Sequence, residues 1–131
     1  MIGWKQVKER LEMLGYDLKA ADLQAAGFCA EKVCCSIKNK THLADIPKGL
    51  EYIAVDMAVG EFLQFKKTFA PGDLTGFDLD YAVKQIQEGD TNIVFAAGEG
   101  SLTAEQRLDR LISHFLTYGQ KEFMHYRRLQ W

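Results

Sequence analysis

The sequence has little of what marks several common classes of protein. Its 131 residues include only three cysteines, two of them adjacent, and two prolines. So few cysteines do not suggest the disulfide framework on which small secreted domains rely. The 16 basic and 18 acidic side chains give a formal charge of -2, so the overall charge offers no argument for nucleic-acid binding. We find neither a linker rich in serine, glycine or proline nor an internal repeat, and therefore expect a single domain over residues 1 to 131.

Long apolar runs are also missing. Residues 1 to 16 contain no apolar core of signal-peptide length, which favours a protein of the cytosol or of a particle assembled there. The most apolar stretch, residues 46 to 67, is interrupted by Glu51, Asp56 and Glu61, and it is too short and too charged to cross a membrane. The composition, 47% hydrophobic and 26% charged, is that of an ordinary globular domain.

Residues 46 to 67 are predicted to form the central helix of the fold. Pro47 suits the first turn of a helix, and no further proline follows it in this stretch. A helix that is apolar on nearly opposite faces is normally surrounded by other elements. One face carries Leu50, Ile53, Ala54 and Met57, and the other carries Tyr52, Val55, Val59 and Phe62.

Three further helices are predicted around it. Apolar residues at helical spacing predict helices over residues 3 to 14 and over about 21 to 38. Gly15 is expected to end the first of these, and Asp22 is expected to cap the second. The fourth helix begins at a capping box formed by Thr103 and Gln106, carries an apolar stripe, and is expected to end at Gly119. The stripe consists of Leu108, Leu111, Ile112, Phe115 and Leu116.

The segment between the third and fourth helices has a different character. Residues 70 to 80 contain a Pro-Gly pair and three aspartates, and they are typical of a loop. Residues 82 to 96 are predicted to form a β-hairpin that turns at Gly89. A lone hairpin is marginally stable in water, so it must pack on something or be completed by a partner. The expected fold is mainly α, a bundle of about four helices with a protruding hairpin or long loop.

Metal binding and catalysis are not predicted. Cys34 and Cys35 are adjacent on a predicted helix and point about 100° apart, so with Cys29 and His42 they do not give the usual zinc spacing. No histidine lies in a nucleophile motif, and there is no glycine-rich phosphate loop. Asp56 and Glu61 point in different directions on the central helix, and we interpret each as the partner of a lysine or arginine from a neighbouring helix or subunit. We expect no catalytic residue, cofactor or metal.

The end of the chain, residues 126 to 131, is aromatic and basic. Tyr126, Arg127, Arg128 and Trp131 have the composition of interface hot spots. The same residues could stack on nucleic acid, although one arginine pair in a chain of neutral balance makes this the weaker alternative. In a third alternative, Trp131 folds back onto the helices.

The order of segments resembles the phage head–tail connector proteins, the small head-completion proteins of tailed phages and prophages of Gram-positive bacteria. The resemblance covers roughly residues 30 to 131 and runs through IKNKTHLADIPKGLEYIAVDMAVGEFL, AVKQIQEGDTNIVF and the terminal YRRLQW. The positions that match the family's motifs are Lys38, Asn39, Pro47, Gly49, Gly89, Asp90, Thr91, Tyr126, Arg127 and Trp131.

This resemblance implies a helical bundle with a long loop or hairpin and a structural function without catalytic residues. Such proteins form a ring of about a dozen copies below the portal, with head-to-tail contacts between copies. The implied partners are other copies of the chain, the portal protein, and tail or stopper proteins. DNA passes through the ring without specific binding, and the protein belongs to the neck of the virion after assembly in the host cytoplasm.

Two sets of residues are candidates for contacts in such a ring. Charged and polar side chains are spread around the central helix, so hardly any quadrant of its surface is wholly apolar. Asp56 and Glu61 are therefore candidates for charge pairs between subunits. The second set, in the hairpin and tail, contains the candidates for the subunit or portal interface, which are Lys84, Ile86, Gly89, Asp90, Thr91, Ile93, Tyr126, Arg127, Arg128 and Trp131.

The alternative function is that of a small DNA-binding or regulatory helical module.

Overall fold

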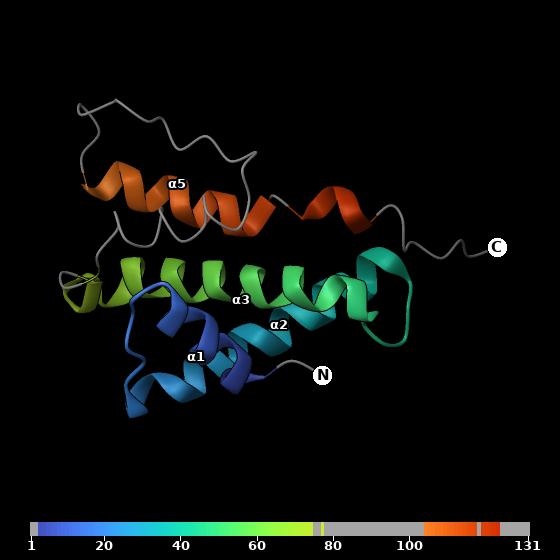
Figure 1. Ribbon diagram of the computed structural model, residues 1–131, viewed down its shortest axis with the longest axis horizontal. Helices are drawn as coiled ribbons and strands as arrows, with labels where there is room; N and C mark the ends of the chain where they lie inside the picture. The colour runs from blue at the N-terminus through green and yellow to red at the C-terminus, as the bar shows by residue number, and fades with distance from the viewer. Residues whose placement is uncertain (1–2, 75–76, 78–103, 118, 124–131) are drawn as a thin grey trace.

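A computed structural model describes residues 3–74, 77, 104–117 and 119–123 of the chain (Figure 1). The predicted bundle of about four helices is confirmed, whereas the hairpin predicted over 82 to 96 lies outside the described residues. No described helix is both long and apolar enough to cross a membrane. The elements are α1 (Trp4–Met13), η1 (Ala20–Asp22), α2 (Leu23–Thr41), α3 (Lys48–Phe69), η2 (Pro71–Leu74), α5 (Ala104–Thr117) and η3 (Gln120–Glu122), where η marks a 3-10 helix.

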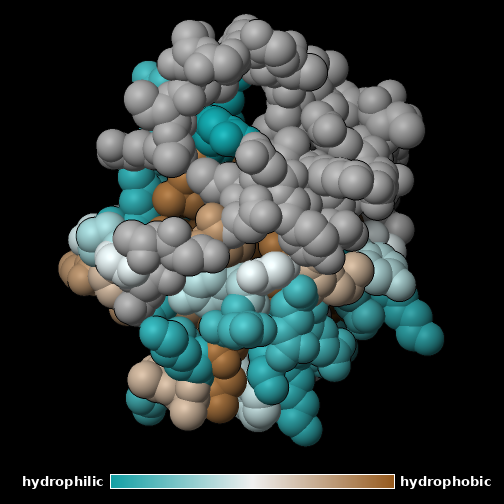
Figure 2. All heavy atoms as spheres, turned by 60° about the vertical axis from the view of Figure 1, so that its left-hand side comes forward, coloured by the Kyte–Doolittle hydropathy of each residue, from teal (hydrophilic) through white to brown (hydrophobic). Residues whose placement is uncertain are grey.

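α3 is the centre of the bundle, as its opposed apolar faces predict. α1 and α2 pack on one side of it and α5 on the other (Figure 1). Its buried residues run from Leu50 to Lys66, but Tyr52, which belongs to one of the apolar faces, is 82% exposed. Seen from the side on which α3 ends, hydrophobic atoms reach the surface among hydrophilic ones (Figure 2). The neighbours of α3 therefore cover most of its apolar surface but not all of it.

α1 ends at the glycine that the sequence predicts. Gly15 has a φ of 89°, the left-handed conformation that favours glycine, and its N–H donates to the carbonyl of Glu12 at 3.0 Å. The N–H of Tyr16 donates to the carbonyl of Leu11 at 2.8 Å, which completes a Schellman motif. This turn directs Tyr16 into the core, where its ring meets Phe62 edge-on with centroids 6.0 Å apart.

The expectation that Asp22 caps α2 is wrong. The residue immediately precedes the helix, but its backbone is already helical and its side chain makes no cap hydrogen bond to α2. Its carboxylate instead accepts the N–H of Lys19 at 3.3 Å and lies 2.5 Å from Nζ of Lys66. The Asp22 carboxylate, which was expected to cap the N-terminus of α2, therefore forms an ion pair with the buried ammonium of Lys66 near the end of α3.

His42, which follows α2, adopts the left-handed conformation with φ 58° and ψ 28°. His42→Gly is expected to raise the free energy of unfolding by about 0.5 to 1 kcal/mol, because relief of the Cβ clash exceeds the entropy that glycine adds to the unfolded chain. Urea denaturation followed by circular dichroism measures the change. His42→Ala keeps the Cβ atom and is the control, from which we expect no such gain. A less stable glycine variant would contradict the prediction.

Gly119 marks a close approach of the chain to α3. α5 ends at Thr117, two residues before the predicted Gly119, and Gly119 itself is buried. A Cβ atom added there would lie 2.4 Å from Cγ2 of Ile53. The glycine is therefore required by packing, since a methyl group cannot enter unless Ile53 moves.

Gly119→Ala is expected to lower the free energy of unfolding by about 1 to 3 kcal/mol through overpacking against Ile53. Thermal denaturation measures this loss, which we expect to shrink when Ile53→Ala makes room for the new methyl group. Gly72→Ala is the control, because a Cβ atom at Gly72 meets nothing within 4 Å. Equal stability of the Gly119→Ala and Gly72→Ala variants would contradict the prediction, because it would show that the Ile53 side chain moves aside at little cost in free energy.

Candidate functional site

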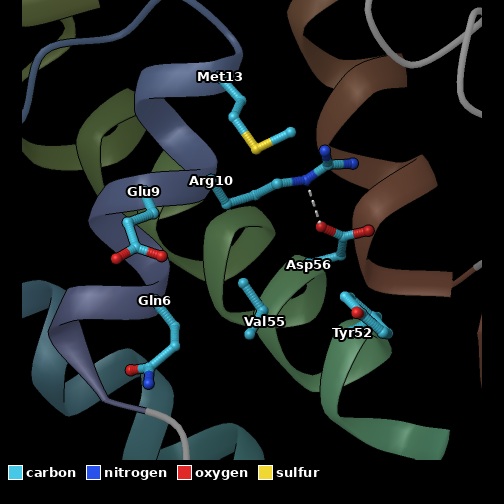
Figure 3. A pocket seen from close by; sticks show the side chains of 7 residues that line it. All are labelled: Gln6, Glu9, Arg10, Met13, Tyr52, Val55 and Asp56. Atoms are coloured by element: carbon cyan, nitrogen blue, oxygen red, sulfur yellow. Dashed lines mark hydrogen bonds and ion pairs between the residues drawn. The ribbon is translucent and has the colours of Figure 1, made fainter.

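A groove of about 360 Å³ lies between α1 and α3 (Figure 3). Each helix presents residues three and four positions apart, which share one face of a helix. The groove is therefore formed where one face of α1 lies against one face of the first half of α3. The lining residues are Gln6, Glu9, Arg10 and Met13 of α1 and Tyr52, Val55 and Asp56 of α3.

An ion pair joins the two helices at this groove. Nε of Arg10 donates to Oδ1 of Asp56 at 2.7 Å, and the two side chains are 26% and 10% exposed. In Figure 3 the Arg10 side chain reaches from α1 across to Asp56 on α3. The guanidinium also lies 6.0 Å from the ring centroid of Phe115 on α5, within range of a cation–π contact. Arg10 thus connects three helices at one point.

Glu61, the second carboxylate singled out by the sequence, lies on a different side of α3. It accepts a hydrogen bond from Nζ of Lys32 on α2 at 3.1 Å. The interpretation of both carboxylates as partners of basic residues from neighbouring helices is confirmed. Asp56 and Glu61 are therefore not brought together for acid–base chemistry. Because both are paired within the chain, neither needs a second subunit for its partner, and contacts between subunits through them remain a prediction.

The open part of the groove is apolar. Met13 and Tyr52 are 58% and 82% exposed, and Val55 is half-buried. Glu9, an exposed carboxylate, lies on the α1 wall. A flexible thioether, an aromatic ring and a carboxylate fit a segment that carries apolar and basic side chains. The arrangement is suited to binding a polypeptide segment.

The three cysteines lie on α2, and of the described histidines His42 directly follows α2 and His114 lies on α5. Cys29 and Cys34 are buried, whereas Cys35 is exposed. Burial raises the pKa of the Cys29 thiol, and the carboxylate of Glu61 acts in the same direction against the opposing ammonium of Lys32. Among the side chains that the structure describes, no three histidine, cysteine or acidic groups come together where they could hold a metal ion.

The residues predicted for an interface fall mostly outside the described part of the chain. This holds for every candidate between residues 84 and 93 and between 126 and 131. Sequence reasoning did not single out Arg10, Met13 or Tyr52 as a group. Their helical spacing was visible within each helix, but no signal showed that the two faces would meet.

Comparison with protein-family models, with curated proteins and with solved structures finds no match for the chain. The functional interpretation therefore depends on the residues themselves. The relevant properties are the exposure of the aromatic side chains, the pairing of the charges and the place of the groove in the bundle.

Proposed function

We propose that the protein is a structural component of a phage particle, a head–tail connector that forms a ring below the portal and joins the capsid to the tail. The observation that carries the proposal is the order of motifs in residues 30 to 131, from IKNKTHLADIPKGL through the GDT segment to YRRLQW. The first of these motifs leads directly into α3, the helix on which the other described helices pack. The proposed function needs no catalytic residue or cofactor.

The distribution of exposed aromatic rings supports a role in assembly. Phe28 on α2, Tyr52 near the start of α3 and Phe69 at its end are 68%, 82% and 74% exposed. Tyr52 and Phe69 lie near opposite ends of α3. A closed ring joins one patch of each copy to a different patch of the next, and aromatic residues are enriched in protein interfaces.

The pairing of basic side chains supports a protein that lets DNA pass without holding it. In the part of the chain that the structure describes, a carboxylate partners each of the five basic residues named below, which leaves these cations less available to phosphates. The alternative, a small DNA-binding module, predicts a duplex affinity that falls steeply as salt rises. The five pairs are Lys8–Glu12, Arg10–Asp56, Lys32–Glu61, Lys66–Asp22 and Lys67–Asp109.

Light scattering at rising protein concentration, with electron microscopy of the particles that form, tests the proposal. We expect rings, either from the protein alone or after addition of the portal protein as a template. A chain that stays monomeric under both conditions, or that binds duplex DNA with a steep salt dependence, would contradict the connector function.

Two variants test the interface assignment within this function. Deletion of residues 126 to 131 and substitution Gly89→Val are each expected to weaken ring formation and portal binding. Cys35→Ser, a small change at an exposed position on α2, is the control. The assignment of the hairpin and tail fails if both variants assemble as the control does.

A further inference from the structure

Three exposed phenylalanines form a ridge where α2 lies alongside α3. Phe28 of α2 and Phe65 and Phe69 of α3 are 68%, 40% and 74% exposed, and the rings of the two α3 residues have centroids 5.2 Å apart. The two helices are antiparallel (Figure 1), and an ion pair between Lys32 and Glu61 joins them. Phe28 precedes Lys32 by one turn of α2. Phe65 follows Glu61 by one turn of α3, so both rings lie on the same side of the ion pair.

The ridge has the size and composition of the core of a protein interface. Aromatic side chains bury about 150 to 250 Å² each, so at these exposures the ridge presents on the order of 300 to 450 Å² of surface. The largest apolar patches on monomers are of this size and are often functional. A standard interface buries about 800 Å² on each partner, with an apolar core inside a polar rim. The exposed side chains of Gln24, Lys32 and Gln64 beside the ridge can form such a rim.

The ridge and the groove between α1 and α3 lie on opposite sides of α3. Glu61, beside the ridge, follows the groove residue Tyr52 by nine residues, which is about two and a half turns of helix. The two side chains therefore leave α3 about 180° apart. One molecule can use its ridge and its groove at the same time. A heterologous contact requires this, because it joins one patch of each copy to a different patch of the next.

The ridge and the groove match in the spacing and chemistry of their side chains. On α2, Phe28 and the 58% exposed Lys32 are four residues apart and share one face of the helix. On α1, the groove residues Glu9 and Met13 are also four residues apart. When α2 of one copy runs antiparallel to α1 of the next, Phe28 meets Met13, whose sulfur packs favourably on an aromatic ring. Lys32 then meets Glu9 one turn further along, and its three donors allow it to bind Glu61 as well.

We propose that the ridge of one copy docks into the groove of the next copy, with Phe28 between Met13 and Tyr52 and with Lys32 facing Glu9. The groove, about 360 Å³ in volume, has the size of pockets that bind small organic groups, and Tyr52 supplies an aromatic partner for the inserted ring. A second copy is the occupant because one chain carries both surfaces on opposite sides of α3 and cannot join them itself. The inference rests on the proposed connector function, within which it is a contact between neighbouring copies of the ring.

Two variants that each remove one surface test the contact. Phe28→Arg removes the inserted ring and Tyr52→Arg obstructs the groove, and both residues are exposed enough for the fold to accept the change, which circular dichroism verifies. In sedimentation velocity at up to about 1 mM protein, we expect each variant to associate with itself at least ten-fold more weakly than the unmodified chain. An equal mixture of the two is expected to form dimers, because it retains one intact ridge and one intact groove. Ser113→Arg, at an exposed position of α5, is the control and is expected to associate as the unmodified chain does.

An exchange of charges tests the register of the contact. Glu9→Lys and Lys32→Glu each place two like charges opposite each other, and each is expected to weaken association several-fold. An equal mixture of these two variants restores one pair of opposite charges and is expected to recover association. If the mixture associates no better than the separate variants, the proposed register is wrong.

Three further results would overturn the proposal. An unmodified chain that stays monomeric at about 1 mM does not make the contact. A Tyr52→Arg variant that associates as the control does shows that copies meet through another surface, and a monomeric mixture of the two arginine variants shows that ridge and groove do not bind each other. Electron microscopy with the portal protein as template separates this contact from the connector function. Rings that take up both arginine variants as readily as the control refute the contact alone, whereas mixed dimers without rings in any sample refute the connector function alone.

Discussion

Lys66→Met is expected to lower the free energy of unfolding by about 3 to 5 kcal/mol, because it leaves the buried carboxylate of Asp22 without its counter-charge. The two side chains are 6% and 7% exposed, and Nζ of Lys66 lies 2.5 Å from Oδ1 of Asp22. Methionine keeps most of the side-chain volume, so the loss measures the charge and not a cavity. Urea denaturation followed by circular dichroism gives the free energy.

Two further variants make this prediction specific. Lys32→Met removes the partner of Glu61, but Lys32 is 58% exposed, so water replaces the ion pair and the expected loss is below about 1 kcal/mol. The double variant Asp22→Leu with Lys66→Met removes both charges and is expected to recover much of the stability. A Lys66→Met variant as stable as Lys32→Met would mean that the Asp22 carboxylate finds water or another cation.

Phe115→Ala is expected to cost about 3 to 5 kcal/mol, the usual range for truncation of a buried phenylalanine. The side chain is fully buried between α5 and α3, and its ring lies 6.0 Å from the Arg10 guanidinium. A Cβ atom added to Gly60 of α3 would lie 3.0 Å from Cβ of Phe115, so the two helices are in close contact at this point. The cavity therefore opens at a close contact between α5 and α3.

Thermal and urea denaturation measure the effect of this truncation. Phe69→Ala is the matched control, since it removes the same ring from a position that is 74% exposed and is expected to change stability by less than about 0.5 kcal/mol. Similar losses in the two variants would contradict the assignment of Phe115 to the core between α3 and α5.

The helices could be predicted because their signals are local. Pro47 and the spacing of apolar residues predicted the start of α3, and Gly15 predicted the end of α1. α2, in contrast, continues to Thr41, beyond the predicted end near residue 38. Asn39 to Thr41 resemble turn residues in the sequence, but Thr41 is buried and its Oγ1 donates to the carbonyl of Ile37 at 2.8 Å. Tertiary burial overrides the local preference at this end.

The candidate site was predictable only in part. The sequence correctly indicated that Asp56 pairs with a basic residue from a neighbouring helix, but it did not identify Arg10. Met13 and Tyr52 line the same groove because of the rotation of α1 about its own axis and its crossing angle with α3. Helix packing determines both, and the spacing of residues within either helix does not. Burial of Lys66 could not be predicted either, because a lysine in the last turns of a helix is usually solvated.

The packing of α5 has a consequence for how the molecule opens. Among the described elements, α1, α2 and α3 all pack on one another, whereas α5 packs extensively on α3 alone. α5 can therefore separate while the other three helices stay together, as a cooperative unit of lower stability than the whole domain. Its amide protons are expected to exchange with solvent deuterium through this partial opening, earlier than those at the centre of α3. The α1–α2–α3 unit is then the last part of the domain to lose its protection.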